Sequence, residues 1–263
     1  MNKGYEEIAK MMHENKIKDT HVEHTDIKCD VCLMPISRVT IEFEDGRTNM
    51  KETGCKCAAI EMVNKKQREI NAKSFDNESI MHGDYKFKTF ENYNAATESQ
   101  LNALKVTKYY ADHFNEMIEN SQSLLMQGQF GTGKTHLAAA VRNQLFKKHY
   151  RVLFVSMPDY LEKLKESFND KNQNQRHHIY KFAKEADLLI FDDVGANKMS
   201  EWAIAELFRL VDARRSKCTI YTTNLTSEQL RATQDLYRVF SRMMERAKPV
   251  VVDGEDHRMK GMF

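Results

Sequence analysis

The chain has 263 residues, of which 41% are hydrophobic, so it can hold one large domain or two smaller ones with packed cores. It carries 40 Lys and Arg against 38 Asp and Glu, and the net charge of +2 excludes a global basic field, which leaves any nucleic-acid contact to local patches. No apolar run approaches the roughly 20 residues that cross a bilayer, and the charged N-terminus is unlike a signal peptide. We therefore expect a cytoplasmic protein without membrane association.

Four of the five cysteines lie in the first quarter of the chain, in the motifs CDVC at 29–32 and CKC at 55–57. Two close pairs of thiolates match the tetrahedral ligand set of a structural Zn²⁺ site. A segment this small and polar also needs a metal in order to fold. We therefore expect a small zinc-binding N-terminal domain at residues 1–75, with Cys29, Cys32, Cys55 and Cys57 as ligands.

Alternatives to this interpretation stay open. The thiols could instead be reduced and free or form a redox pair, and His21 or His24 could replace one cysteine ligand. A helix with a basic face is predicted from residue 58 to about residue 72, so the module is also compatible with nucleic-acid binding. The basic residues just after the cysteines are Lys65, Lys66, Arg68 and Lys73.

The next segment, residues 76–95, has no periodicity, and we expect a linker there. Beyond it, Leu101, Leu104, Ala111, Phe114 and Ile118 have the spacing of an amphipathic helix. Short apolar runs then alternate with stretches of helix length, which predicts an α/β fold with a parallel five-stranded sheet in residues 96–263. The predicted strands lie at residues 124–126, 152–155, 188–191, 219–222 and 250–252.

The first of these strands leads into GQFGTGKT at residues 128–135, and a predicted helix follows. This is the GxxxxGK[ST] pattern of a phosphate-binding loop (P-loop) in its required context. The glycines let backbone N–H groups face the phosphates, while Lys134 would reach the β- and γ-phosphates and Thr135 would ligate Mg²⁺. We expect ATP and Mg²⁺ as cofactors, with Gly128, Gly131, Thr132, Gly133, Lys134, Thr135 and His136 as binding residues.

The run LLIFDDVG, residues 188–195, predicts a buried strand that delivers Asp192 and Asp193 beside this loop, where ligands bind in open α/β sheets. Asp192 would hold Mg²⁺ through water, and Asp193 would orient or deprotonate the attacking water. Asn224, at the end of CTIYTTN, is placed to touch the γ-phosphate or that water, although a strand-ending turn residue explains it equally well. These elements predict an ATPase.

Several motifs occur together in a consistent order over about residues 85–263: GQFGTGKTH, LLIFDDVG, TTNL, the helix EWAIAELFRLVDARR, YRVFSRMMER and the terminal GEDHR. Together they resemble the AAA+ ATPases of the DnaC/DnaI type, the replicative helicase loaders of bacteria and phages. The resemblance implies an AAA+ P-loop ATPase domain in which Asn224 is sensor I, Arg242 the arginine finger and Arg258 sensor II. Because an arginine finger acts on the neighbouring subunit, it also implies a homo-oligomer. Arg238 and Arg246 receive no such role.

The same resemblance implies partners. Residues 1–75 would hold a hexameric replicative helicase of the DnaB type, and the helices between the second and third strands would help to engage single-stranded DNA. A solvated helix face is the alternative there, because Glu162, Glu166 and Glu185 interrupt the positive charge. The basic candidates for DNA contact are Lys163, Lys165, Arg176, His177, His178, Lys181 and Lys184.

The function that the resemblance implies is ATP-dependent loading of the replicative helicase onto single-stranded DNA in the initiation of DNA replication. The alternative within the same clade is a transposition helper of the IstB type, a group that generally lacks a cysteine module. A small-molecule P-loop kinase would need a substrate-binding lid, which the sequence does not offer. A zinc adaptor with a vestigial nucleotide site is the remaining class.

Overall fold

The computed structural model of the chain describes residues 17–169, 173–195 and 199–257, without the side chains of residues 167–169 and 173–177. The chain forms two compact units that divide between Gln67 and Arg68. The division falls before the segment 76–95 that the sequence analysis treats as a linker. None of the helices in the described ranges is long and apolar enough to cross a bilayer.

The first unit contains a three-stranded antiparallel sheet in the order β1-β2-β3. The strands are β1 (Ile17–Lys28), β2 (Pro35–Phe43) and β3 (Thr48–Thr53), and α2 (Cys57–Glu78) begins after them. Among the described residues of this unit, 17–67, no apolar side chain is buried. The sheet therefore has no apolar core of its own, and the physical reason for expecting a metal there is strengthened.

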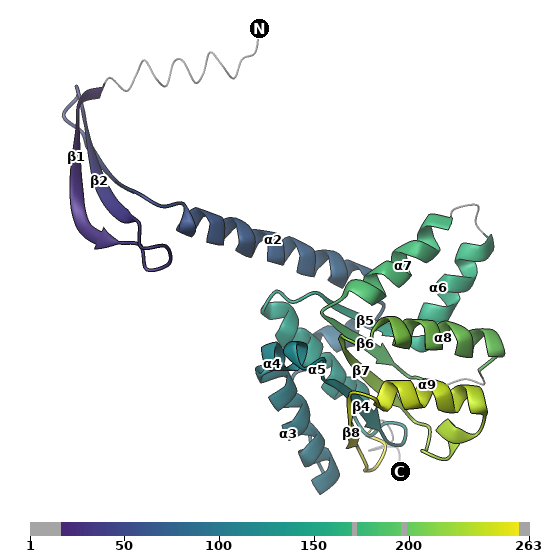
Figure 1. The fold of residues 1–263 in the computed structure, drawn as a ribbon. Helices are drawn as coiled ribbons and strands as arrows, with labels where there is room; N and C mark the ends of the chain where they lie inside the picture. Colours follow the sequence, from purple (N-terminus) through teal and green to yellow (C-terminus); the bar gives the residue numbers. More distant parts are fainter. Residues whose placement is uncertain (1–16, 170–172, 196–198, 258–263) are drawn as a thin grey trace. The chain divides into compact units, whose positions relative to one another are not determined.

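The second unit is built on a five-stranded parallel sheet in the order β5-β6-β7-β4-β8 (Figure 1), which confirms the predicted fold class. Parallel neighbours need a crossover connection, and helices supply it between most strands. The strands are β4 (Ser123–Gln127), β5 (Val152–Ser156), β6 (Leu188–Asp192), β7 (Cys218–Thr223) and β8 (Ala247–Val251).

Helices cover both faces of this sheet, because successive strand residues point to opposite sides and feed two apolar clusters (Figure 1). Leu124 and Met126 pack on the side of α3 (Glu98–Asp112), α4 (Phe114–Glu119) and α5 (Lys134–Lys147). Leu125 packs on the side of the later helices. These are α6 (Met157–Asn169), α7 (Gln173–Glu185), α8 (Glu201–Ala213) and α9 (Gln234–Met244), while η1 (Gly83–Phe87) and η2 (Gln229–Arg231) are short 3₁₀ turns.

The amphipathic helix expected at residues 101–118 is two helices, α3 and α4, which meet at His113. Its predicted apolar face is partly wrong, since Leu101 and Ile118 are 46% and 40% exposed. Gln100 and Thr107 are buried instead. Their polar atoms are hydrogen-bonded internally, and this allows polar side chains to occupy the packed face.

The segment from Arg68 to residue 95 belongs to the second unit and packs against its sheet and α5. Asp76 forms an ion pair with the buried Arg142 of α5. The Ile80 N–H donates to the Phe154 carbonyl at 2.8 Å, so the chain pairs briefly with the edge strand β5. Few residues of the part expected to be a linker, 76–95, are buried, and for that reason no periodic pattern marks it in the sequence.

Arg214, just after α8, is buried and joins α7 to β7. Its guanidinium donates to the Ala183 and Ala186 carbonyls at 2.7 and 3.1 Å, and to the Cys218 carbonyl. Burial lowers the pKa of Arg214 to about 10, so the side chain stays charged at neutral pH. It therefore serves as an internal cap for the C-terminus of α7.

Replacing Arg214 by alanine is expected to lower the free energy of unfolding by about 3 kcal/mol or more, because several buried carbonyls lose their donor at about 1–3 kcal/mol each. Urea denaturation of the purified protein measures the change. Arg215→Ala is the control, since Arg215 makes only an exposed pair with Glu245 and such pairs contribute about 0–1 kcal/mol. Equal losses in the two variants would contradict the capping role.

Candidate nucleotide-binding site

The P-loop connects β4 to α5 and curls around the ammonium group of Lys134. The Lys134 Nζ donates to the Gly128 carbonyl at 2.8 Å and to the Gln129 carbonyl at 2.6 Å. Gly133 has a φ of 99°, and a Cβ there would lie 2.6 Å from the ring of Tyr93, so glycine is required at this position. The loop and the N-terminus of α5 thus form an anion-binding geometry.

Residues outside the loop hold its backbone in place. The Thr132 carbonyl accepts from the Tyr93 hydroxyl at 3.3 Å and from Gln100 Nε2 at 3.1 Å. The His257 N–H donates to the Gly131 carbonyl at 3.1 Å. The segment expected to be a linker, the start of α3 and the C-terminal segment therefore all contact the phosphate loop.

His136, in the first turn of α5, faces the segment that precedes α3. Its Nε2 lies 3.0 Å from the Thr89 carbonyl oxygen and 2.9 Å from Asn92 Oδ1. Both partners are acceptors, so the proton is assigned to Nε2. Burial lowers the pKa of His136, so the ring is neutral at neutral pH. The structure places this predicted binding residue against the side of the site, where its ring packs on Tyr93.

Asp192 ends β6 and lies beside the P-loop. Its Oδ1 accepts from the Thr135 hydroxyl at 3.1 Å and from the Thr222 hydroxyl. Burial raises the pKa of Asp192 to about 6, while the two hydrogen bonds act in the opposite direction, so the carboxylate is ionised at neutral pH. A hydroxyl and a carboxylate side by side are the oxygen ligands that Mg²⁺ prefers, so these residues fit the expected ion.

Asp193 and Asn224 lie at the same edge of the sheet as the P-loop. Asp193 follows β6 with a φ of 55°, and its backbone N–H donates to the Thr222 hydroxyl at 2.9 Å. Asn224 directly follows β7, which pairs with both β4 and β6. The parallel register thus brings these two predicted residues to the carboxyl edge that carries the loop.

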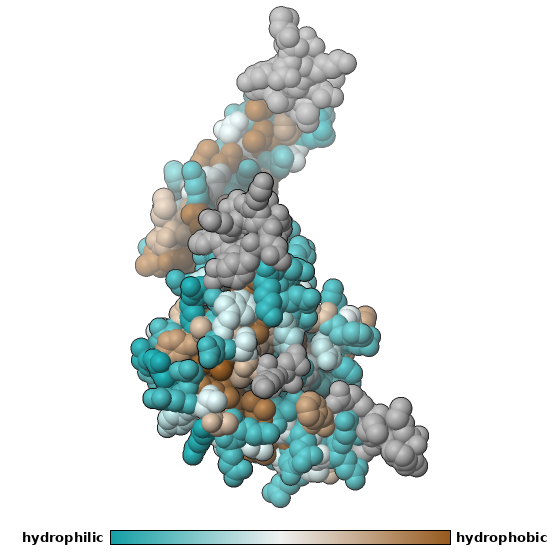
Figure 2. Space-filling view, turned by 90° about the vertical axis from the view of Figure 1, so that its right-hand side faces the viewer, coloured by the Kyte–Doolittle hydropathy of each residue, from teal (hydrophilic) through white to brown (hydrophobic). Residues whose placement is uncertain are grey.

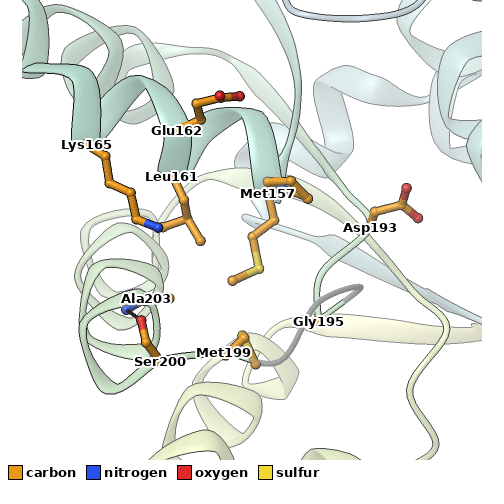
Figure 3. Close-up of a pocket in the computed structure, with 10 residues that line it drawn as sticks. Met157, Leu161, Glu162, Lys165, Asp193, Gly195, Met199, Ser200 and Ala203 are labelled. Carbon is orange, nitrogen blue, oxygen red and sulfur yellow. Dashed lines mark hydrogen bonds between the residues drawn. The ribbon is translucent and has the colours of Figure 1, made fainter.

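On the face of the second unit seen in Figure 2, hydrophilic residues predominate and apolar side chains gather in a smaller area. A pocket of about 370 Å³ borders Asp193 (Figure 3). This pocket is mostly apolar, so we expect the phosphates to bind at the P-loop and not in the pocket. Its lining consists of Met157, Pro158, Leu161, Glu162, Lys165, Asp193, Gly195, Met199, Ser200 and Ala203.

The three arginines spaced by four residues near the C-terminus have different surroundings. Arg242, on α9, pairs with Asp212 of α8 and with Glu245, each at 3.3 Å. Arg238 stacks over an aromatic ring, and Arg246 donates to a backbone carbonyl. Among the three, Arg242 has a guanidinium held by two carboxylates at the protein surface.

The candidates for DNA contact lie on α6 and α7. Lys165 lies over the ring of Trp202 at 5.4 Å, and His178 lies 3.5 Å from a Glu78 carboxylate oxygen. Contacts within the chain therefore already engage two of the candidates. Lys163, Lys181 and Lys184 are on the same two helices. The side chains of Arg176 and His177, and all of Arg258, lie outside the described residues.

The four cysteines of the first unit form one cluster, in which all sulfur atoms lie within 4.8 Å of one another. A tetrahedral ion with bonds of about 2.3 Å to sulfur needs sulfur atoms about 3.8 Å apart, so the cluster fits a metal. Hydrogen bonds from the Cys32 backbone and the Cys55 side chain lower the pKa of Cys29 to about 6. Among the residues described, this cluster includes neither His21 nor His24.

Sequence reasoning missed four residues that contact this site: Tyr93, Gln100, Thr222 and His257. Tyr93 lies in the segment expected to be a linker, and Gln100 is polar, so it does not contribute to the apolar spacing from which the helix was predicted. Thr222 and His257 lie inside motifs that were recognised, CTIYTTN and GEDHR, only two residues and one residue from a predicted site residue. A polar residue close to a predicted catalytic position is the sequence signal that points to these last two.

Comparison with known proteins is consistent with this geometry. The sequence matches the family described as IstB-like ATP binding protein over residues 46–262. It is 31% identical over 157 residues to the replicative helicase loader DnaC of Escherichia coli strain K12, an alignment covering 59% of this chain and 62% of DnaC. It is 27% identical over 185 residues to the replicative helicase loader DnaI of Bacillus subtilis strain 168, covering 65% of this chain and 58% of DnaI.

A solved structure shares the fold of the second unit. The crystal structure of the DnaC helicase loader superposes with a TM-score of 0.56 at 26% identity, covering 65% of this chain and 99% of that one. The expected AAA+ P-loop fold is thereby confirmed. The alignments with the curated relatives DnaC and DnaI span about three fifths of their length, 62% and 58%.

Proposed function

The chain belongs to the family of IstB-like ATP-binding proteins, and we propose that it is an ATPase that loads a replicative DNA helicase onto single-stranded DNA. The observation that carries the proposal is the bond from the Thr135 hydroxyl to the buried Asp192 beside the P-loop, in a fold shared with the DnaC loader. The similarity to two proteins named as helicase loaders favours this function over others in the family. Its place of action is the cytoplasm.

ATP is held by the backbone of residues 128–133, the N-terminus of α5 and Lys134, which exchanges the loop carbonyls for phosphate oxygens. Bound Mg²⁺ would neutralise charge on the phosphates, and Thr135 and Asp192 are the residues that would hold it. Asp193 orients the attacking water and accepts its proton. Asn224 contacts the γ-phosphate from the end of β7.

Hydrolysis needs an arginine from a neighbouring copy, and we assign this role to Arg242. The guanidinium exchanges Asp212 and Glu245 for the γ-phosphate of the next subunit. The guanidinium group of Arg242 is planar and always charged, so it can bind the two carboxylates in one state and the γ-phosphate in the other. ATP binding thereby promotes a head-to-tail homo-oligomer.

The first unit, stabilised by Zn²⁺ on its four cysteines, holds the hexameric helicase of the DnaB type. Two apolar side chains next to the cysteines support a protein partner, since Val31 is 77% exposed and Leu33 is 70% exposed. Lysines of α6 and α7 contact the DNA backbone. Hydrolysis then favours release of the helicase.

Size-exclusion chromatography with the replicative helicase of the same host tests this proposal. We expect a complex in the presence of ATP, and Val31→Glu together with Leu33→Glu should abolish it, because two charges cannot be buried in an apolar contact. The control is Val63→Glu, which changes an exposed valine on α2, outside the turn that carries Val31 and Leu33. Absence of any complex for the wild-type protein would contradict the loader function.

A transposition helper is the second candidate, because the family description itself names IstB-like proteins. Such a helper would form a complex with a transposase in size-exclusion chromatography and would form none with the helicase. ATP consumption that depends on a metabolite would indicate a kinase instead. An adaptor with a vestigial nucleotide site would hydrolyse no ATP, so Lys134→Ala would leave the measured rate unchanged.

A further inference from the structure

Thr222, in β7, contacts both aspartates of the nucleotide site through one side-chain hydroxyl. The hydroxyl donates to Asp192 Oδ1, and the same oxygen accepts from the Asp193 backbone N–H at 2.9 Å. The side chain is completely buried. One hydroxyl group therefore holds the Asp192 carboxylate, which would hold Mg²⁺, and the backbone from which the Asp193 carboxylate projects.

The contact of Thr222 with Asp193 holds an unusual backbone conformation. The φ of Asp193 is 55°, in the left-handed region that residues other than glycine rarely adopt. Such a conformation persists only where the surroundings hold it. The Thr222 carbonyl also accepts from the Val194 N–H at 2.8 Å. Thr222 thus fixes the backbone of two successive residues, from which the Asp193 side chain projects.

Thr223, the next residue of β7, has equal burial but different partners. Its hydroxyl donates to the Val194 carbonyl at 2.7 Å and accepts from the Leu225 N–H at 3.1 Å. In both threonines a buried hydroxyl donates one hydrogen bond and accepts another. The difference is that the partners of the Thr223 hydroxyl lie in loop backbone and include neither aspartate.

We propose that Thr222 is a positioning residue for the ATPase reaction, which orients Asp192 toward Mg²⁺ and Asp193 toward the attacking water. The inference rests on the proposed function. It differs from the role given to Asn224, because Thr222 touches no substrate and acts only through the two aspartates. Hydrogen-bond partners behind metal ligands typically contribute about 10–100-fold in metal affinity or activity.

Thr222→Val removes the hydroxyl with little change in shape, Thr222→Ser retains it, and Thr223→Val is the matched control. Binding of a non-hydrolysable ATP analogue is measured in a Mg²⁺ titration and in EDTA, and kcat and KM are measured with ATP. For Thr222→Val we expect the Mg²⁺ concentration at half-saturation to rise and kcat to fall, each by about 10–100-fold. Nucleotide affinity in EDTA should stay at the wild-type value.

Thr222→Ser keeps the hydroxyl, and Thr223→Val removes one that contacts neither aspartate, so both should change less than the about 10-fold expected when a partner of a metal ligand is lost. Equal behaviour of Thr222→Val and Thr223→Val would overturn the positioning role, and so would a loss in Thr222→Ser as large as that in Thr222→Val. Should Thr222→Val fail to fold by circular dichroism, Thr222→Ala makes the same deletion of the hydroxyl. A wild-type protein that binds no nucleotide would contradict the proposed function itself.

Discussion

Arg242→Ala is expected to lower kcat for ATP hydrolysis by about 10³–10⁵-fold and to leave ATP binding unchanged, because an arginine finger stabilises charge that develops only in the transition state. Within its own chain Arg242 contacts Asp212 and Glu245, both at the surface, so its loss should have little effect on folding. Steady-state ATPase assays and nucleotide-binding titrations measure the two quantities separately.

The control for this variant is Arg238→Ala, which removes an arginine one helical turn away with a 64% exposed side chain. It should hydrolyse ATP at close to the wild-type rate. Arg242→Lys should not rescue activity, because an ammonium group cannot make the planar bidentate contact.

A mixing experiment tests whether the finger acts between subunits. Arg242→Ala subunits bind ATP but lack the finger, and Lys134→Ala subunits carry the finger but bind no ATP. We expect each variant alone to be inactive and the mixture to regain part of the activity, because the second supplies its arginine to the first. If Arg242→Ala alone hydrolyses ATP at the wild-type rate, Arg242 is not an arginine finger and is only a surface residue.

Removing the metal is expected to unfold the first unit and to leave the second unit intact. No apolar side chain is buried in residues 17–67, so a metal on the four cysteines would supply the stabilisation that a core would give. Structural zinc sites of small domains contribute about 10–16 kcal/mol. After treatment with a chelator, limited proteolysis should cleave within residues 17–67 while the second unit remains resistant. Elemental analysis should first show one zinc ion per chain.

The matched variants are Cys29→Ser and Cys218→Ser. Cys29→Ser removes one ligand of the cluster and should lose the zinc and the complex with the helicase. Cys218 is buried in β7 and, among the residues that the structure describes, belongs to no metal-binding cluster, so Cys218→Ser should retain one zinc ion. A metal-free protein whose first unit still resists proteolysis would contradict the structural role of the metal.

The second unit could be predicted from sequence because its strands are short apolar runs and its P-loop has an explicit pattern. Parallel pairing then placed Lys134, Asp192 and Asn224 at one edge without any knowledge of the side chains. The boundary between the units was less predictable. Ala72 and Phe75 are buried as one pair and Phe90 and Tyr93 as another, and two such pairs are too few to produce a periodic signal.

The details of the site depend on contacts between residues distant in sequence. The hydrogen bonds from Tyr93 and Gln100 to Thr132 span 39 and 32 residues, and no local pattern encodes them. Thr222 is a β-branched residue in a strand, a position where its type needs no functional explanation. Its importance becomes visible only when the folded chain brings its hydroxyl to two carboxylates.

The most direct test of the account is a helicase-loading assay on closed circular single-stranded DNA, which has no free end for a ring to thread. The replicative helicase of the host, this protein and ATP are combined, and helicase retained on the circle is measured after gel filtration. We predict retention that requires the wild-type protein and is lost with Lys134→Ala and with Val31→Glu combined with Leu33→Glu. Equal retention of the helicase with and without this protein would contradict the loader function.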